Sequence, residues 1–229
     1  MPTAINVINL TVTYPHEKPA LKNINWQLKH GEWLGITGSN GSGKTTLLYC
    51  LAGLISKHIP AKITGEALIN QSVGIVFQNP DFSLFNLTVA EEVAFGARGP
   101  IEPALKAVGM YRQKSADPQT LSYGGKQKVC LAAVLAKNPD LILLDEPTSM
   151  LDYKSALELY RLLNKLNQQG KTIVVVEHDT DFLFEFTQKT LILDQGKQVA
   201  FGPSQTVLKR TRLLKRLGLK PACRQGRPL

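Results

Sequence analysis

Cysteine is scarce in this 229-residue sequence: Cys50, Cys130 and Cys223 are odd in number and far apart. Such a set offers no disulfide framework and no clustered metal ligands, so it favours reduced thiols in a cytosolic protein. Long hydrophobic runs are also absent, and none approaches the ~20 residues that span a bilayer. The N-terminus lacks a basic region followed by a long apolar core, so no signal peptide is evident.

Acidic residues are missing from the last part of the chain. Between Gln205 and Leu229 there are eight basic residues and no acidic one, which leaves +1 of the net charge of +9 for everything else. The basic residues are Lys209, Arg210, Arg212, Lys215, Arg216, Lys220, Arg224 and Arg227. Three interpretations stay open: contact with nucleic acid, contact with anionic lipid at the cytoplasmic membrane face, or a solvated helix end.

The remaining composition is that of a folded protein. With 43% hydrophobic and 20% charged residues, the chain is globular rather than disordered. Its length fits one sizeable domain or a core with an inserted lobe, and no internal repeat or low-complexity tract is visible.

The most informative stretch is Gly38-Ser39-Asn40-Gly41-Ser42-Gly43-Lys44-Thr45-Thr46, which fits the phosphate-binding loop G-x-x-x-x-G-K-[ST]. Its flanks agree, because a short apolar strand precedes it and leucines at helical spacing follow it. The glycines let successive N–H groups turn toward an anion, and the following helix adds its positive end. Lys44 is predicted to reach the β- and γ-phosphates, and the Thr45 hydroxyl to ligate Mg²⁺.

Strands and helices alternate around this loop. Residues 6–14 and 21–29 alternate apolar and polar side chains, which predicts half-exposed antiparallel strands. Short apolar runs at 73–77, 141–144, 172–176 and 191–194, with a helix over 153–169, predict a mainly parallel sheet covered on both faces. Between 79 and 138 helical spacing replaces strands, and Thr88 to Glu91 has the form of a capping box. We interpret this segment as an inserted helical lobe.

Two carboxylates, Asp145 and Glu146, follow the apolar run Leu141 to Leu144. In open α/β sheets ligands bind at the carboxyl ends of strands, where the phosphate loop also lies. Asp145 is therefore predicted to hold Mg²⁺, and Glu146 to accept a proton from the water that attacks the γ-phosphorus. An acidic pair after a strand is weak evidence alone, but it gains weight beside Lys44 and Thr45.

Two further strand ends carry polar side chains that can contact a phosphate, Mg²⁺ or the attacking water. His178 follows the strand 172–176 and can hydrogen-bond the γ-phosphate or the attacking water. Gln78 ends the strand 73–77 and can contact Mg²⁺ or that water. Either residue alone also suits an exposed strand end.

A second anion site is predicted where Ser122 and Gly124 open a helix. It lies in the helical lobe, too far along the fold to reach the same nucleotide within one chain. This suggests a head-to-tail dimer in which ATP is held between one subunit's loop and Ser122 of the other. The alternative is an ordinary helix cap.

Together these motifs resemble the nucleotide-binding subunit of ABC transporters over nearly the whole chain. The loop resembles Walker A, Gln78 the Q-loop residue, and 121–125 the signature. Residues 141–146 resemble Walker B, 149–152 the D-loop with Asp152, and His178 the switch histidine. Tyr14 matches the aromatic residue that stacks on adenine.

The resemblance implies a fold and a division of the chain. It implies a P-loop NTPase (RecA-like) α/β core with a mainly parallel sheet, an N-terminal antiparallel β subdomain and an inserted helical lobe. The core with its β subdomain is expected at 1–78 and 139–204, the lobe at 79–138, and the basic tail at 205–229.

Finer details are similar to the energy-coupling-factor group, which imports vitamins and transition-metal ions: 76–81, 88–96, 175–179 and the Gly218-Leu219 pair. Three features depart from the pattern. Tyr123 and Gly125 stand where the signature has glycine and glutamine, which weakens that half-site. The lobe between Phe95 and Leu121 is also short, and the chain stops soon after Pro221.

The leading hypothesis is therefore an importer ATPase that uses ATP and Mg²⁺ at the cytoplasmic face of the membrane. It pairs with a second ABC ATPase subunit, a copy or a relative, and with an integral membrane subunit. Phe82, Leu84 and Phe85 are candidates for contact with that membrane subunit, and the alternative is that they pack inside the lobe. No direct contact with cargo and no nucleic-acid partner are expected. The alternative hypothesis is a soluble ABC-type ATPase that acts on nucleic acid or ribosomes, suggested by the basic tail.

Overall fold

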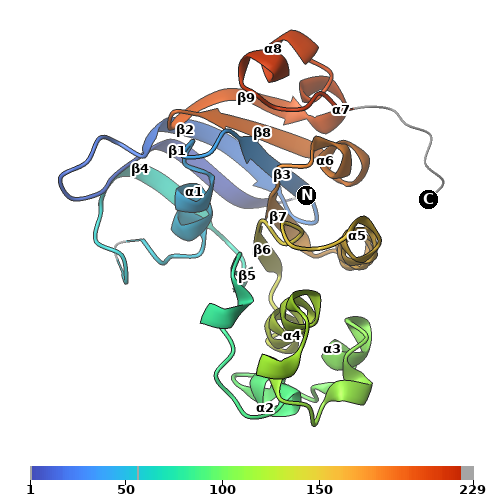
Figure 1. Cartoon of the computed structure of the whole chain (residues 1–229). Helices are drawn as coiled ribbons and strands as arrows, with labels where there is room; N and C mark the ends of the chain where they lie inside the picture. The colour runs from blue at the N-terminus through green and yellow to red at the C-terminus, as the bar shows by residue number, and fades with distance from the viewer. Residues whose placement is uncertain (1, 56, 223–229) are drawn as a thin grey trace. The chain divides into compact units, whose positions relative to one another are not determined.

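The computed structural model describes residues 2–55 and 57–222 in two compact units (Figure 1). Unit 1 comprises the chain up to Asn70 and from Val174 onward, and unit 2 comprises Gln71–Ile173. Cys223, Arg224 and Arg227, which belong to the predicted tail, lie outside the described residues.

The N-terminal part of unit 1 is a three-stranded antiparallel sheet in the order β2-β1-β4. Its strands are β1 (Thr3–Thr13), β2 (Leu21–Lys29) and β4 (Lys62–Ile69). Along β2, Ile24, Trp26 and Leu28 are buried while the residues between them are exposed. This alternation is the predicted one, and the antiparallel subdomain is confirmed. The sequence pattern predicts this third strand at Glu66 to Asn70, and β4 begins four residues earlier.

The remaining strands of unit 1 form a mixed sheet in the order β7-β3-β8-β9. They are β3 (Trp33–Gly38), β7 (Thr172–Val176), β8 (Lys189–Asp194) and β9 (Lys197–Pro203). The first two residues of β7 belong to unit 2. β3 is buried along its whole length and pairs in parallel with β8, whereas β9 is antiparallel to β8 at the edge. The carboxyl end of β3 is Gly38, the first residue of the phosphate loop.

The described part of unit 1 also contains four helices: α1 (Lys44–Leu51), α6 (Thr180–Phe186), α7 (Ser204–Val207) and α8 (Thr211–Arg216). α1 packs against β3 and β4, α6 against β3, and α7 against β8 and β9. Leu214 is fully buried, whereas its neighbours Lys215 and Arg216 are exposed. The basic segment therefore begins with a short helix that is fixed through a leucine.

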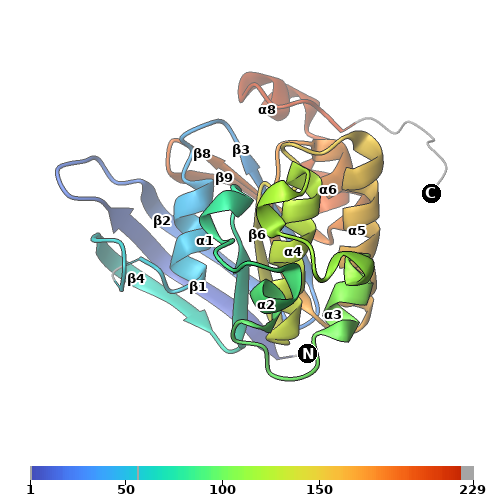
Figure 2. The same cartoon turned by 60° about the horizontal axis from the view of Figure 1, so that its bottom comes forward.

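Unit 2 combines two parallel strands with a group of helices. The strands are β5 (Val73–Val76) and β6 (Leu141–Asp145), and Asp140 beside β6 accepts a hydrogen bond from the Thr172 N–H at 2.9 Å. The helices are α2 (Val89–Ala94), α3 (Glu102–Ala107), α4 (Tyr123–Ala136) and α5 (Tyr153–Gln168), with 3₁₀ turns at Pro80–Phe82, Tyr111–Gln113 and Pro118–Thr120. Both α2 and α3 pack against α4 (Figures 1 and 2).

The predicted capping box at the start of α2 is present. The Glu91 N–H donates to Thr88 Oγ1 at 3.2 Å, and the Thr88 N–H donates to Glu91 Oε2 at 2.9 Å. Two exposed N–H groups at the helix start are thereby satisfied.

Among the described residues, four helices and strands were not predicted from the sequence pattern: α6, β9, α7 and α8. Among the described residues, no helix combines the length and the apolar character needed to cross a bilayer. Burial raises the pKa of both the Cys50 and Cys130 thiols to about 12, so they stay protonated at neutral pH.

Candidate functional site

The phosphate loop of unit 1 requires glycine at its two ends. Gly38 has φ 155°, and a Cβ at this position would lie 2.1 Å from the Leu193 carbonyl oxygen. Gly43 has φ 100°, and its Cβ would lie 2.7 Å from the Ala20 carbonyl oxygen. The backbone therefore turns tightly between β3 and α1, which leaves the loop N–H groups free of side chains that would screen them.

Inside this loop the polar groups suit an anion. The Lys44 side chain is only 5% exposed, and its Nζ donates to the carbonyl oxygens of Gly38 and Ser39, both at 3.0 Å. The buried Ser42 hydroxyl has no hydrogen-bond partner. No side chain caps the N-terminus of α1. A buried ammonium, an unpartnered hydroxyl and an uncapped helix start all gain from phosphate oxygens.

The other predicted binding residues of unit 1 lie around the same turn. Ser39 Oγ donates to Asp194 Oδ1 at 3.1 Å, which ties the loop to the end of β8. Asn40 and Gly41 lie at the exposed tip, and Thr45 and Thr46 lie in the first turn of α1. The Tyr14 hydroxyl is 3.2 Å from Thr46 Oγ1, so the predicted adenine-stacking residue borders the loop.

His178 lies at the same sheet edge as the loop within unit 1. β7 neighbours β3, and the Glu177 N–H donates to the Ile36 carbonyl at 3.0 Å. Glu177 Oε1 accepts the His178 N–H at 2.7 Å and the Asp179 N–H at 3.2 Å, which fixes the turn before α6. The exposed imidazole therefore projects from a held backbone two residues past the strand.

In unit 2 the structure brings Gln78 and Glu146 together. Gln78 Nε2 donates to Glu146 Oε2 at 2.9 Å, although the residues are 68 positions apart. Glu146 follows the buried Asp145 at the end of β6 and has φ 46°, in the left-handed region. A non-glycine residue held there is strained, and such strain concentrates at functional sites. The strained turn directs the carboxylate to the neighbouring strand end.

Two helix starts in unit 2 carry the other predicted contacts. Ser122 caps α4, accepting the Gly125 N–H at 3.2 Å, and Gly124 lies in the first turn. Asp152 caps α5, accepting the Ser155 N–H at 2.8 Å. That backbone hydrogen bond lowers the pKa of Asp152, so its carboxylate is charged at neutral pH.

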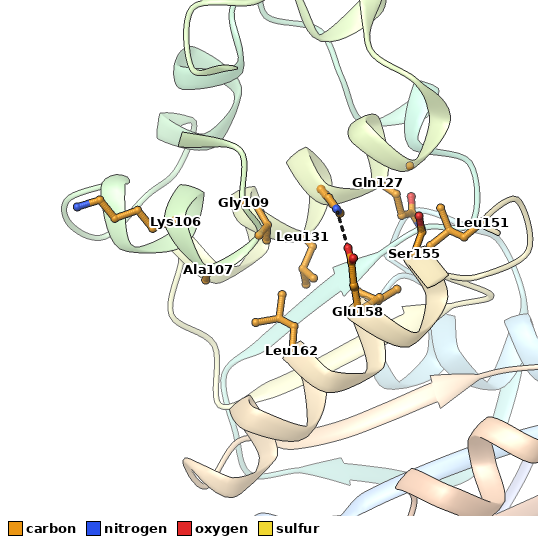
Figure 3. Close-up of a pocket in the computed structure, with 13 residues that line it drawn as sticks. Lys106, Ala107, Gly109, Gln127, Leu131, Leu151, Ser155, Glu158 and Leu162 are labelled. Carbon is orange, nitrogen blue, oxygen red and sulfur yellow. Dashed lines mark ion pairs between the residues drawn. The ribbon is translucent and has the colours of Figure 1, made fainter. Parts of the chain in front are cut away.

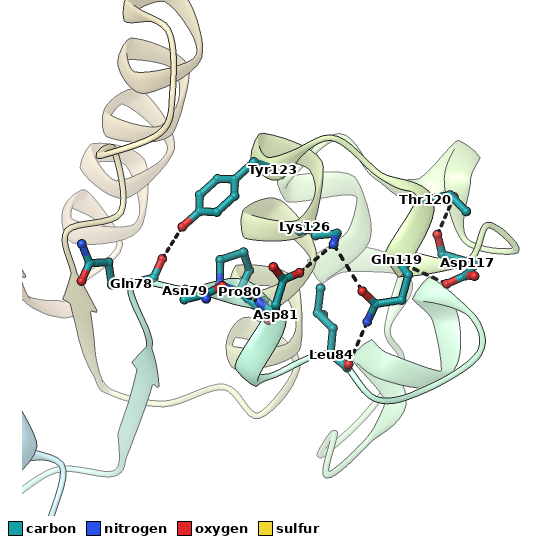
Figure 4. Close-up of polar contacts among 11 residues, drawn as sticks. Gln78, Asn79, Pro80, Asp81, Leu84, Asp117, Gln119, Thr120, Tyr123 and Lys126 are labelled. Atoms are coloured by element: carbon teal, nitrogen blue, oxygen red, sulfur yellow. Dashed lines mark hydrogen bonds and ion pairs between the residues drawn. The ribbon is translucent and has the colours of Figure 1, made fainter.

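Tyr123 makes a contact that sequence analysis missed. Its hydroxyl donates to the Gln78 carbonyl at 2.7 Å, so the departure from the signature pattern links α4 to the Q-loop (Figure 4). Three residues on, Lys126 donates to Asp81 at 2.6 Å and to the Gln119 side chain at 3.2 Å. The unusual tyrosine was visible in the sequence, but no local signal identified a partner 45 residues away.

The predicted metal ligands have the right chemistry for Mg²⁺. Thr45 offers a hydroxyl, Asp145 a carboxylate, and Gln78 the amide oxygen that remains when its Nε2 bonds Glu146. Within the described ranges, no group of three or more His, Cys, Asp or Glu side chains could form a closed cage. Oxygen ligands of this kind suit Mg²⁺, which keeps several waters and is bound together with substrate phosphates.

The glycine-rich loop after a buried parallel strand, the acidic end of β6 and the antiparallel β subdomain define an ATP-binding cassette of the P-loop class. Comparison with known families agrees, since the ABC transporter model matches residues 21–149. The chain belongs to the ABC transporter ATP-binding family and has its fold: a mixed, mostly parallel sheet with a three-stranded antiparallel subdomain and helices.

Relatives cover nearly the whole chain. The energy-coupling factor transporter ATP-binding protein EcfA of Carboxydothermus hydrogenoformans is 37% identical over 96% of this chain and 88% of its own length. The structure of cbiO1 from Clostridium perfringens, described as part of the ABC transporter complex cbiONQ, has a TM-score of 0.82 at 29% identity and covers 95% of both chains. The ATP-binding cassette MJ0796, solved as a dimer with ADP and Pi, has a TM-score of 0.75 at 31% identity over 87% of this chain and 98% of its own.

Proposed function

We propose that the chain is the ATP-hydrolysing subunit of an energy-coupling-factor type importer for a vitamin or a transition-metal ion. Similarity to EcfA over 96% of the chain supports the importer class. One observation carries the catalytic assignment: Glu146 is held in a strained turn and accepts a hydrogen bond from Gln78.

The roles proposed for the site residues follow from their chemistry. Lys44, the loop N–H groups and the start of α1 bind the phosphates, and Tyr14 stacks on adenine. Glu146 accepts the proton of the attacking water, which Gln78 and His178 orient. Thr45, Gln78 and Asp145 would hold Mg²⁺, which would neutralise charge on the phosphate oxygens.

The second half of the site comes from another ATPase subunit, either a copy or a relative. Ser122, Gly124 and Asp152 are proposed to complete the nucleotide site of that neighbour. The dimer of MJ0796 with ADP and Pi supports pairing as a general mode of such cassettes. ATP-driven closure of this pair would move the membrane partner, and the chain would lie at the cytoplasmic face as a peripheral subunit.

The surface proposed to receive the membrane subunit lies in unit 2. Phe82 is 77% exposed and Phe85 is 73% exposed, and both line a cavity of about 340 Å³ together with Phe77 and Phe95. Large exposed aromatic side chains around a cavity are typical of a protein contact. Leu84, predicted from sequence to share this role, is instead buried at 4% exposure because it packs inside the unit.

Nucleotide binding by purified wild type and by Lys44→Ala tests the proposal. Loss of the buried ammonium that faces the phosphates is expected to weaken Mg-ATP binding at least tenfold, since a charge-assisted hydrogen bond contributes about 1.5–3 kcal/mol. Unchanged affinity would contradict the loop assignment.

The importer class is tested by copurification in detergent. We expect a membrane protein to copurify with wild type and to be lost with Phe85→Asp, whereas Asn40→Asp at the loop tip retains it. Salt-sensitive RNA or DNA binding without a membrane partner would favour the nucleic-acid alternative.

A further inference from the structure

Unit 2 contains a cavity of about 260 Å³ between α3, α4 and α5 (Figure 3). Its walls combine leucine side chains with polar ones. The leucines are Leu131 from α4, Leu151 from the turn before α5, and Leu159 and Leu162 from α5, and the polar residues are Lys106, Gln127, Lys128, Ser155 and Glu158. Gly124 and Ser155 line it at the first turns of α4 and α5. Of the residues that line this cavity, only Gly124 has a role proposed above.

A buried amide lies in the wall of the cavity. Gln127 on α4 is only 3% exposed, and neither its Oε1 nor its Nε2 has a hydrogen-bond partner. Buried polar side chains are nearly always paired, and each orphaned group costs about 1–3 kcal/mol. Two such atoms on one side chain that lines a cavity therefore point to a missing partner inside that cavity.

A single water would pair with the amide but would fill only a small part of the cavity, since one water occupies roughly 30 Å³ in the liquid. An occupant that covers the leucines and also pairs with the amide satisfies both kinds of surface.

The charged side chains that line the cavity already have partners. Lys128 pairs with Glu158 at 3.6 Å, and Lys106 Nζ lies 5.1 Å from the centre of the Tyr111 ring. The pair between Lys128 and Glu158 itself lines the cavity next to the leucines (Figure 3). A neutral ligand leaves both contacts in place, whereas a charged ligand would compete with them.

We propose that this cavity binds a small neutral molecule with an apolar body and a planar amide, lactam or urea group. Such a group carries an N–H and a C=O side by side. The N–H would donate to Gln127 Oε1, and the C=O would accept from Gln127 Nε2. The volume lies just below the usual range for ligand pockets, so it fits a body of about one ring.

The cavity also touches two of the helix starts assigned above. A Cβ on Gly124 would lie 3.0 Å from Leu151 Cδ2, so these two residues already pack closely beside Ser122 and Asp152. A ligand here would hold the starts of α4 and α5 in place. An effect on ATP turnover rests on the proposed function, whereas binding itself does not.

The probe is benzamide, and its binding to the full-length protein is followed by methyl NMR. Toluene, which lacks the amide, is the control. We expect benzamide to shift the methyl signals of Leu131 and Leu162. Gln127→Leu should weaken benzamide binding about tenfold or more, because two hydrogen bonds of about 1 kcal/mol each are lost. The same variant should bind toluene as well as wild type or better.

A second pair of variants tests the same proposal if Gln127→Leu folds poorly. Leu162→Trp fills the cavity and should abolish benzamide binding, whereas Leu166→Trp, one turn along α5 at a different cavity, should not. The proposal is overturned if benzamide leaves the cavity signals unchanged, if Gln127→Leu binds it as well as wild type, or if a crystal soak shows Gln127 bonded to waters that benzamide does not displace.

Discussion

Replacement of Tyr123 by phenylalanine isolates the contact between the signature helix and the Q-loop. The change removes only the hydroxyl that donates to the Gln78 carbonyl at 2.7 Å and keeps the ring (Figure 4). A neutral hydrogen bond contributes about 0.5–1.5 kcal/mol. Because Gln78 is exposed and water can reach its carbonyl, we expect about 1 kcal/mol, which is about a fivefold change in a local opening equilibrium.

Hydrogen exchange measured by mass spectrometry is the assay. Peptides that cover residues 78–83 should exchange about fivefold faster in Tyr123→Phe, while peptides from α5 should be unchanged. Tyr111→Phe, which alters a tyrosine in another part of unit 2, is the matched control. Equal exchange of 78–83 in Tyr123→Phe and wild type would refute the view that this hydroxyl holds the Q-loop.

The pH dependence of the same contact has a definite sign. Burial, followed by the charges of Asp81 and Cys130, raises the pKa of Tyr123 above its ordinary value. The hydrogen bond therefore contributes fully below the ordinary tyrosine pKa of about 10 and is lost as pH rises through the raised folded value. Exchange of 78–83 in wild type should approach that of Tyr123→Phe only in strongly alkaline buffer.

Two further predictions concern the loop and a helix cap. Gly38→Ala places a methyl group 2.1 Å from the Leu193 carbonyl oxygen, and the resulting strain of at least about 1–3 kcal/mol should lower the melting temperature and abolish ATP binding; a normal melting curve would contradict it. Asp152 has a lowered pKa because it accepts the Ser155 N–H, so its cap is present above the ordinary carboxyl pKa and is lost as pH falls through the folded value. Acid should therefore lower the protection of amides at the start of α5, measured relative to their intrinsic exchange rates, more in wild type than in Asp152→Asn, and identical protection profiles would count against the cap.

The parts of the fold that sequence analysis found are those with a strong local signal. The loop between β3 and α1 has a fixed spacing of glycines, and the Thr88 capping box has reciprocal partners three residues apart. β6 and β7 are short apolar runs that lie buried in the sheet. In each case the pattern and the structure depend on the same neighbours in the chain.

The elements that were missed lack such a signal. α6 has seven residues, too few for a helical period to stand out, and β9 is an edge strand with mixed burial. α8 lies in a segment where charge dominates the composition, and only the burial of Leu214 distinguishes it. Tyr123 and Gln78, like Gln127 and its cavity, are brought together by tertiary packing that no short motif encodes.

The central claim is that Glu146 is the proton acceptor for ATP hydrolysis. The most direct measurement compares Mg-ATP turnover and ATP-dependent dimerisation in wild type and Glu146→Gln, by phosphate release and by size-exclusion chromatography with light scattering. The account predicts that Glu146→Gln binds ATP with near wild-type affinity and hydrolyses ATP at least a hundredfold more slowly than wild type. In the presence of ATP, the variant should form a stable dimer, or a stable pair with a related ATPase subunit. Turnover at the wild-type rate would contradict the account.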